Sequence, residues 1–369
     1  MNSTSKKVLF IIPTTNPGGI ETYLLRFLIY IKNNELIEPI LLVRNLNKGE
    51  LSKEYEKLNI QIHYKPLGYF NIKNIITYLN LFKENKFDTI CDFNANFAGI
   101  PVFLGKIVGV KNRITFYRQG KNHFKNNLFK FLYNKILNFL VYKYSTKILS
   151  NSKASIEFFF ANKVVDDRFK VIYNGLDIES IDKINVLPNK LKQELNIPDN
   201  AFIVCHSGRL DKAKNHNAIL NLAQKAIKQD SSIYFIICGL DTEKLNNKII
   251  ELGIQNNFRT LGYRKDIPQI LKSSNLFYFP SFTEGQPNAL IEAIICGLPF
   301  IASNIPPIIE IIPKEFNNLL VDPDDTDKAL KLLFSIKNKE NDNNFKESKT
   351  WASNFFSHNI RFLEFVKCL

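Results

Sequence analysis

The sequence predicts an α/β protein made of two domains, each built on a parallel sheet. Apolar strands alternate with helical segments from residue 7 to residue 173, and the alternation starts again at Ala201. Such alternation is typical of parallel sheets covered by helices. A polar segment broken by prolines, residues 178–198, separates the two runs and is predicted to link the domains. At 369 residues with 45% apolar content, the chain can form two full cores.

The individual elements are predicted from the spacing of apolar residues and from the residues that start or end helices and turns. In the first run, strands are expected at 7–13, 40–43, 60–63, 89–93, 113–117, 147–150 and 169–173, with helices at 20–32, 72–84, 99–108 and 121–147 and a short one capped by Ser152. In the second run, strands are expected at 201–206, 233–238, 258–261, 275–279 and 300–303, with helices from 217 onward, at 305–311 and at 327–336. The aromatic-rich tail predicts further helices.

A glycine pair, Gly18 and Gly19, joins the first strand to the first helix. Glycine lets a ligand approach the backbone, and the following helix start favours anions. No Gly-Lys-Ser/Thr or G-x-G-x-x-G pattern is present, so this is not a Walker loop or a dinucleotide fingerprint. The pair alone is compatible with a functional loop or with a plain turn.

A second glycine loop follows the strand at 201–206 and contains Gly208, Arg209 and Lys214. An arginine can bind a diphosphate with two parallel hydrogen bonds, and a lysine adds a point charge. The alternative interpretation is a solvated basic loop.

The segment 280–297 joins a strand, a tight turn and a helix, and it carries two carboxylates, Glu284 and Glu292. The backbone N–H groups at the helix start favour an anion such as phosphate. The alternative is that Glu284 complements the helix dipole and Glu292 is an ordinary helix residue. Pro287 suits the first helical turn. The residues that form the turn and the helix start are Gly285, Gln286, Pro287, Asn288 and Ala289.

The net charge of +14 is unevenly placed, because no acidic residue lies between Asp92 and Glu157 while eleven basic ones do. Possible partners of such a region are nucleic acid, an anionic membrane or a phosphorylated acceptor. The helix expected at 121–147 interleaves aromatic residues and lysines, which fits docking on an anionic bilayer or a core-facing apolar stripe with a solvated lysine face. Nucleic acid is disfavoured because no recognised binding motif accompanies the charge.

The composition predicts a reduced, cytoplasmic and soluble protein. No apolar run is long enough for a membrane span, and the N-terminus lacks a signal-peptide pattern. The five cysteines are widely spaced, which argues against disulfides and zinc. The acidic residues at 322–325 precede a helix and are expected to act as caps, so no metal site is predicted.

Taken together, these motifs resemble the retaining glycosyltransferases of family 4. The resemblance rests on Glu284-x7-Glu292, the following Gly297-Leu-Pro, Gly208-Arg209-Leu and the lysine at 214. It implies the GT-B fold: two doubly wound Rossmann-like domains facing across a cleft, with a C-terminal helix crossing back. We expect an acceptor-binding domain at 1–185, a nucleotide-sugar-binding domain at 186–345 and the crossing helix at 346–369.

The resemblance also implies a reaction. The substrates would be a UDP-linked sugar, carrying a hexose or N-acetylhexosamine, and a lipid-linked or polysaccharide-precursor acceptor at the cytoplasmic membrane face. No cofactor or divalent metal would be needed, and the anomeric configuration would be retained. Arg209 and Lys214 would hold the donor diphosphate, Glu292 the ribose and Glu284 the donor sugar near its anomeric carbon. Arg264 belongs to the segment 262–266, which would lie by the base.

Two positions depart from the family pattern. Many members carry a histidine after the strand that matches 113–117, where this chain has Arg118. We expect Arg118 to replace that histidine as a hydrogen-bond donor, with His123 as the alternative. Gln286 stands where an apolar residue usually follows Gly285, which leaves the donor sugar open.

Two other functions fit the same motifs. A sugar-nucleotide epimerase on this fold would form product without an acceptor. A non-catalytic membrane scaffold would keep its function in cells after replacement of Glu284 and Arg209.

Overall fold

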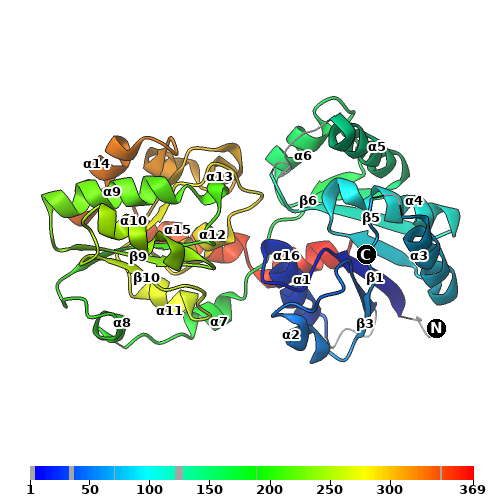
Figure 1. Cartoon of the computed structure of the whole chain (residues 1–369), viewed down its shortest axis with the longest axis horizontal. Coiled ribbons are helices and arrows are strands. Elements are labelled where there is room, and N and C mark those ends of the chain that lie inside the picture. The colour runs from blue at the N-terminus through cyan, green and yellow to red at the C-terminus, as the bar shows by residue number, and fades with distance from the viewer. Residues whose placement is uncertain (1–4, 33–36, 70, 121–127, 188, 341–342) are drawn as a thin grey trace. The chain divides into compact units, whose positions relative to one another are not determined.

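The computed structural model describes residues 5–32, 37–69, 71–120, 128–187, 189–340 and 343–369. The chain forms two compact units, of which unit 1 comprises residues 1–175 and 359–369 and unit 2 comprises residues 176–358. Figure 1 shows that each unit is a sheet covered by helices. The two units are described separately below.

Unit 1 contains a seven-stranded sheet in the order β3-β2-β1-β4-β5-β6-β7, in which every pairing is parallel. The strands are β1 (Lys6–Ile12), β2 (Ile37–Val43), β3 (Gln61–Tyr64), β4 (Thr89–Asp92), β5 (Asn112–Tyr117), β6 (Lys147–Ser150) and β7 (Phe169–Val171). The strand order reverses between β1 and β4. In such sheets, ligands bind beyond the carboxyl ends of the strands at this switch point.

Helices cover both faces of that sheet. They are α1 (Gly19–Tyr30), α2 (Ser52–Glu56), α3 (Ile72–Asn85), α4 (Gly99–Ile107), α5 (Leu128–Tyr144), α6 (Lys153–Phe160) and α16 (His358–Val366), the last of which belongs to unit 1 from residue 359. One core joins α1 to the C-terminal segment, where the Phe27 and Phe365 ring centroids lie 4.6 Å apart. A second core joins α3, α4 and α5, and includes Tyr78 and Leu137.

Unit 2 contains a six-stranded parallel sheet in the order β10-β9-β8-β11-β12-β13. Its strands are β8 (Phe202–Ser207), β9 (Ile233–Cys238), β10 (Phe258–Thr260), β11 (Leu276–Phe279), β12 (Phe300–Ser303) and β13 (Leu320–Val321). The order reverses between β8 and β11, so the loops after these two strands meet at a second switch point. The side chains of β8 and β11 are buried almost throughout, as expected for strands covered on both faces.

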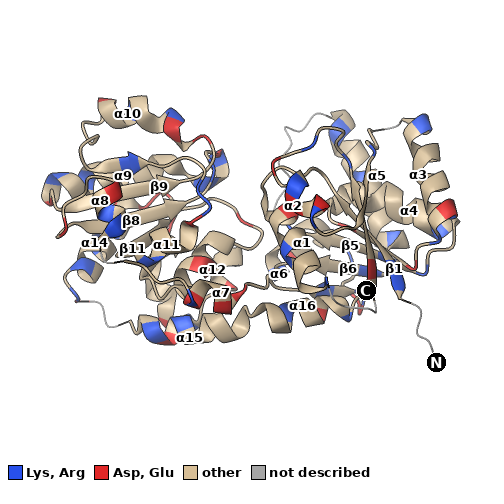
Figure 2. Ribbon diagram, turned by 90° about the horizontal axis from the view of Figure 1, so that it is seen from below, with Lys and Arg blue, Asp and Glu red and all other residues tan. Residues whose placement is uncertain are grey.

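The helices of unit 2 carry basic and acidic residues interspersed (Figure 2). They are α7 (Ile178–Asp182), α8 (Lys190–Glu194), α9 (His216–Gln229), α10 (Asn246–Glu251), α11 (Ile267–Lys272), α12 (Asn288–Ile295), α13 (Pro306–Ile309), α14 (Thr326–Lys337) and α15 (Phe345–Phe355). Local chemistry sets several boundaries: the Asp325 side chain accepts from the Lys328 N–H at the start of α14, and Asn215 adopts a left-handed conformation ahead of α9.

The predicted α/β architecture is confirmed, with differences in detail. The segment expected to be a linker contains α7 and α8, and the units divide at residue 175 instead of 185. Only residues 359–369 of the expected crossing segment join unit 1, because α15 packs on α12 and Phe345 packs against Phe300 of unit 2. The first seven residues of the helix expected at 121–147 lie outside the described residues. Within the described ranges, no helix combines the length and apolar character needed to cross a bilayer.

Candidate functional site

The switch point of unit 2 brings two of the predicted site residues into contact. Lys214 lies in the loop after β8 and Glu284 in the loop after β11, and Lys214 Nζ donates to Glu284 Oε1 at 2.6 Å. A backbone bond from Phe282 N–H to Ala213 O, 2.8 Å long, holds the same two loops together. The two motifs recognised separately in the sequence therefore lie together at one edge of the unit 2 sheet.

The lysine–glutamate pair is largely shielded from water. The side chains of Lys214 and Glu284 are 21% and 10% exposed, and Lys214 Nζ lies 5.1 Å from the centre of the Phe279 ring. Charges in such surroundings interact more strongly than at an open surface. The pair can therefore hold the ammonium group in place for an incoming anion.

Three strand-end glycines lie side by side at the same edge of the sheet. Gly208 N–H donates to Cys238 O, and Gly239 N–H donates to Gly262 O at 2.7 Å. Gly239 has φ +149°, and a Cβ there would lie 2.1 Å from Gly208 O. Gly262 has φ +61°, and its Cβ would lie 1.9 Å from Glu243 Oε1. Only glycine fits the close backbone approach at residue 239, and the left-handed φ of Gly262 favours glycine. Glycines at these strand ends leave the edge open for a ligand.

The His206 side chain lies directly against the Gly208 loop. Its ring is buried, stacks on Phe277 and Phe279, and bonds through Nδ1 to Tyr278 O at 2.9 Å. Burial, followed by the charge of its neighbours His216 and Lys214, holds the pKa of His206 well below its usual range. The imidazole is therefore neutral and presents Nε2 toward Gly208, where an added Cβ would lie 2.9 Å from it.

Arg209, the residue after Gly208, extends into solvent. Its side chain is 63% exposed, and Nη2 lies 3.6 Å from Asp211 Oδ2, which is a loose ion pair. Asp211 in turn accepts from Ala213 N–H at 2.8 Å, which shapes the turn that carries Lys214. Such an arginine can reorient onto a ligand at little cost.

Helix α12 begins beside Glu284, one residue later than the sequence predicted. Pro287 is the residue before the helix (φ −82°, ψ 88°) and lies outside the first turn, because Ile291 N–H makes the first helical bond to Pro287 O. No side chain caps the N-terminus of this helix. Gln286 is buried at the turn, and Glu292 lies half-buried on the helix. The helix start offers backbone N–H groups to an anion.

Arg264 is occupied by protein carboxylates. Its guanidinium donates to both carboxylate oxygens of Asp266, at 2.7 and 2.6 Å, and to Glu194 Oε1 at 2.8 Å. These partners raise the pKa of Arg264. A direct contact with a ligand would require one of the pairs to open, so in this structure Arg264 orders the segment that follows β10.

In unit 1, the Gly18–Gly19 pair lies at the carboxyl end of β1, where α1 begins. A Cβ on Gly18 would lie 2.4 Å from Glu21 Oε2, whereas nothing lies within 4 Å of a Cβ on Gly19. The Tyr55 hydroxyl donates to Glu21 O at 2.6 Å and fixes this turn. A side chain at position 18 would require the Glu21 carboxylate to move, and Gly19 leaves the helix start uncovered.

Arg118, also in unit 1, is a buried cation with unused hydrogen-bonding capacity. Its Nη2 donates to Asn174 Oδ1 at 2.6 Å, and the guanidinium carbon lies 3.6 Å from the centre of the Tyr23 ring. Nε and Nη1 are buried and have no acceptor among the residues that the structure describes. Burial lowers the pKa of Arg118 to about 10, which leaves it charged at neutral pH. His123, the alternative at this position, lies outside the described residues.

Several contributors were not predicted as site residues: His206, Gly239, Glu21, Tyr23 and Asn174. His206 and Gly239 could have been found from their strand-end positions, because His206 lies near the end of buried strand β8 and Gly239 directly follows buried strand β9. The others are brought in by packing of α1 and the loop after β7 around Arg118, for which a single sequence carries no signal.

Both units thus have doubly wound parallel sheets with glycine loops and charged side chains at strand ends, which is the GT-B class of architecture. The solved structure of Anabaena HepE in complex with UDP and glucose has this fold, with a TM-score of 0.82, 20% identity and 98% of both chains covered. The family model "Glycosyl transferases group 1" matches residues 189–351. These residues include the Lys214–Glu284 pair.

Curated relatives agree with this assignment. A capsular polysaccharide biosynthesis glycosyltransferase, CapH of Staphylococcus aureus, is 30% identical over 81% of this chain and 81% of its own length. The UDP-Gal:alpha-D-GlcNAc-diphosphoundecaprenol alpha-1,3-galactosyltransferase of Escherichia coli is 29% identical over 72% of this chain and 70% of its own length. The chain therefore belongs to the group 1 glycosyl transferases.

Proposed function

We propose that this glycosyltransferase moves a hexose or N-acetylhexosamine from a UDP-sugar to a lipid-linked or polysaccharide-precursor acceptor, with retention and without a divalent metal. The observation that carries this proposal is the Lys214–Glu284 contact at the switch point of unit 2, beside the start of α12. It combines a fixed ammonium group, a carboxylate and the N-terminal end of a helix at the strand ends, where a sugar diphosphate would bind.

In the proposed reaction, the bond between the anomeric carbon and the diphosphate oxygen breaks first. The charge that develops on the departing UDP is stabilised by Lys214, Arg209 and the α12 N-terminus. The acceptor hydroxyl then attacks the anomeric carbon from the same face, and its proton passes to the leaving phosphate oxygen. Positive protein groups thereby do what a divalent cation does in other transferases.

Glu284 and Glu292 have separate roles in this scheme. Glu284 is fixed by Lys214 and contacts a donor-sugar hydroxyl near the anomeric carbon, while Glu292 accepts from the ribose. In unit 1, the Arg118 guanidinium donates to the reacting sugar or to its acceptor in place of the family histidine. Its buried Nε and Nη1 groups support this role, because they have no acceptor among the described residues.

The names of relatives and the charge distribution support the proposed acceptor and location. The Escherichia coli relative is named for a diphosphoundecaprenol-linked acceptor, and the Staphylococcus aureus relative for capsular polysaccharide biosynthesis. A lipid-linked acceptor supports peripheral association with a membrane, and we propose its cytoplasmic face. The basic, acid-free stretch between Asp92 and Glu157 supports contact with an anionic bilayer there.

The proposal is tested by UDP release from a panel of UDP-sugars, with diphosphoundecaprenol-linked sugars as acceptors and with EDTA in a parallel arm. Acceptor-dependent release that survives EDTA, with an α-linked product from an α-linked donor, is the expected result. Modification of the donor without acceptor would indicate an epimerase instead. Failure of every donor to shift the thermal midpoint of the protein would contradict the donor assignment.

Glu284→Ala and Arg209→Ala separate catalysis from a scaffold role. Both variants are expected to lose transfer in vitro and function in cells, whereas Lys212→Ala, a change at an exposed lysine of the same loop, retains both. Function in cells that survives both site variants would show that catalysis is not the role of the protein.

A further inference from the structure

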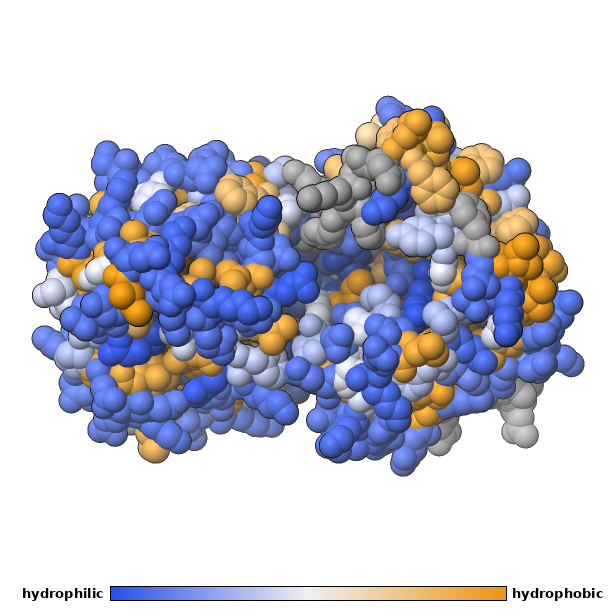
Figure 3. All heavy atoms as spheres, viewed as in Figure 1, coloured by the Kyte–Doolittle hydropathy of each residue, from blue (hydrophilic) through white to orange (hydrophobic). Residues whose placement is uncertain are grey.

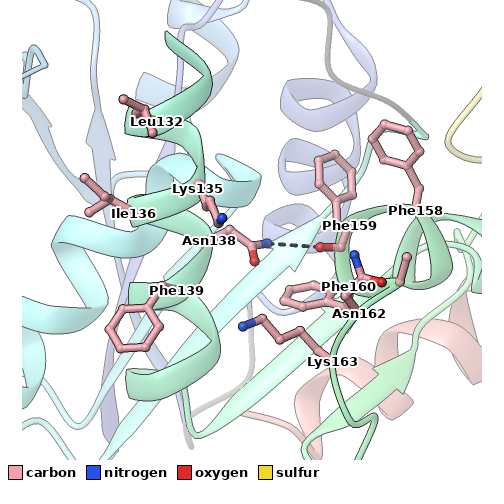
Figure 4. Close-up of a pocket in the computed structure, with 11 residues that line it drawn as sticks. Leu132, Lys135, Ile136, Asn138, Phe139, Phe158, Phe159, Phe160, Asn162 and Lys163 are labelled. Carbon is pink, nitrogen blue, oxygen red and sulfur yellow. Dashed lines mark hydrogen bonds between the residues drawn. The ribbon is translucent and has the colours of Figure 1, made fainter. Parts of the chain in front are cut away.

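A groove in unit 1, separate from the strand-end sites, lies between α5 and the C-terminal end of α6. Its volume is about 640 Å³, within the range of small-molecule sites. We call it the α5–α6 groove, and it is lined by Leu132, Lys135, Ile136, Asn138, Phe139, Phe158, Phe159, Phe160, Ala161, Asn162 and Lys163 (Figure 4).

The helix beside the groove exposes an unusual amount of apolar surface. Only Tyr133, Leu137 and Val141 are buried among the seventeen residues of α5. Six large apolar side chains of this helix are 48–75% exposed: Leu128, Phe129, Phe131, Leu132, Ile136 and Phe139. Figure 3 shows apolar side chains gathered over α5. Large apolar patches on the surface of soluble proteins often mark interaction sites.

The same groove carries positive charge that no described carboxylate neutralises. Figure 4 shows Lys135 extending from α5 toward α6 and Lys163 extending back toward α5. Neither ammonium group forms an ion pair with a described residue, and Lys163 Nζ rests 5.1 Å from the centre of the Tyr142 ring. No acidic residue lines the groove, and Glu157, the nearest one in sequence, is exposed elsewhere on α6.

Both N–H groups of the Asn138 amide already have acceptors within the protein. Asn138 Nδ2 donates to Phe159 O at 3.1 Å and to Asn96 Oδ1 at 3.0 Å. The groove therefore offers two ammonium groups and an apolar wall, and the N–H groups of its Asn138 amide are already used within the protein. A molecule with a phosphate at one end and a hydrocarbon chain at the other is complementary to it in charge and in polarity.

We propose that the α5–α6 groove binds one anionic phospholipid of the bilayer, with its phosphate between Lys135 and Lys163 and an acyl chain against the Phe139 and Phe158 rings. This goes beyond a general attraction of the basic segment to a membrane, because it assigns a site for a single lipid molecule. It does not depend on the transferase reaction, since the groove uses no residue of the strand-end sites. The exposed apolar residues of α5 would enter the bilayer around the bound lipid.

The test is co-sedimentation of the full chain with vesicles of phosphatidylcholine containing phosphatidylglycerol and with vesicles of phosphatidylcholine alone. Preference for the anionic vesicles is expected, and Lys135→Gln and Lys163→Gln should each reduce the partition coefficient about five-fold. Phe139→Ser with Phe158→Ser should reduce it at least as much. The matched controls are Lys73→Gln and Ile76→Ser on α3, because Ile76 is 50% exposed against 48% for Phe139.

A photoactivatable phosphatidylglycerol, with a diazirine on its acyl chain, locates the site directly. Cross-links are expected in peptides that contain Phe139 or Phe158 and should disappear in the Phe139→Ser, Phe158→Ser variant. Cross-links elsewhere, equal binding by all variants, or equal binding to both vesicle types would overturn the proposal. So would a dimer in sedimentation velocity that this variant dissociates, because the groove would then be a contact between copies.

The lipid-binding proposal and the proposed transferase function can be refuted independently of each other. UDP-sugar binding and donor-dependent UDP release in vesicle-free buffer should be the same in the groove variants and the wild type. A preparation that binds lipid in the groove but transfers no sugar would contradict only the proposed function.

Discussion

Lys214 Nζ lies 2.6 Å from Glu284 Oε1, although the two residues are 70 positions apart in the chain. The contact exists because β8 and β11 are neighbours in the sheet while β9 and β10 lie on the other side of β8. A parallel sheet that reverses its strand order leaves the two loops free to meet at this point. The fold thus builds a charged pair where a diphosphate would sit.

Lys214→Ala is expected to lower kcat/KM about 100- to 1,000-fold, because a preorganised charge is removed from the developing diphosphate. Lys212→Ala, at an exposed lysine two residues earlier, should leave kcat/KM close to that of the wild type. The double variant Lys214→Ala, Glu284→Ala should lose less than the product of the two single losses, since each residue holds the other. Initial rates over a range of UDP-sugar concentrations give kcat/KM for each variant. Strictly multiplicative losses would argue against a shared role.

Much of this site could be predicted from the sequence. Gly208, Lys214 and Glu284 each follow a buried strand, and strand ends are where a parallel sheet presents ligand groups. The contact between Lys214 and Glu284 could not be derived from periodicity alone, because it depends on which strands are neighbours. The hydrogen-bond partners of Arg264 could not be predicted either. Asp266 comes from a turn, and Glu194 comes from the segment predicted to link the domains.

Gly239→Ala is expected to destabilise unit 2 by at least about 2 kcal/mol, because its Cβ would press on Gly208 O and the backbone has φ +149°. The matched control is Gly253→Ala, where φ is +69° but nothing lies within 4 Å, so backbone strain alone should cost about 1 kcal/mol. Urea unfolding of the two variants gives both numbers. The Gly239 variant should also bind UDP more weakly, since the Gly208 loop must shift. Equal destabilisation by the two variants would refute the crowding argument.

Acidification is expected to destabilise unit 2 through His206. Burial lowers the pKa of this histidine in the folded state, so the unfolded chain takes up the proton first. Stability is therefore fully present above the unfolded-state pKa of about 6.5 and falls below it by up to about 1.4 kcal/mol per pH unit. Urea midpoints between about pH 7.5 and pH 5 should show a smaller slope for His206→Asn, which keeps a donor for Tyr278 O. Part of the slope should remain, because burial also lowers the pKa of His216. An unchanged slope would place the acid sensitivity elsewhere.

Arg118→Met should separate stability from activity in unit 1. The buried, charged guanidinium has Asn174 as its one side-chain hydrogen-bond acceptor among the described residues. It therefore carries a desolvation cost, which the Tyr23 ring offsets in part. Replacing it with a flexible apolar side chain is therefore expected to leave the urea midpoint unchanged or higher, while sugar transfer falls about 10-fold or more because a donor to the reacting groups is lost. Arg113→Met is the contrasting variant: its guanidinium donates to the carbonyl oxygens of Val110 and Tyr144, so its loss should cost about 1–3 kcal/mol of stability and leave the activity per folded molecule intact. If Arg118→Met unfolds more easily and transfers sugar at the wild-type rate per folded molecule, the guanidinium serves the fold, and its unused N–H groups have no part in binding a substrate.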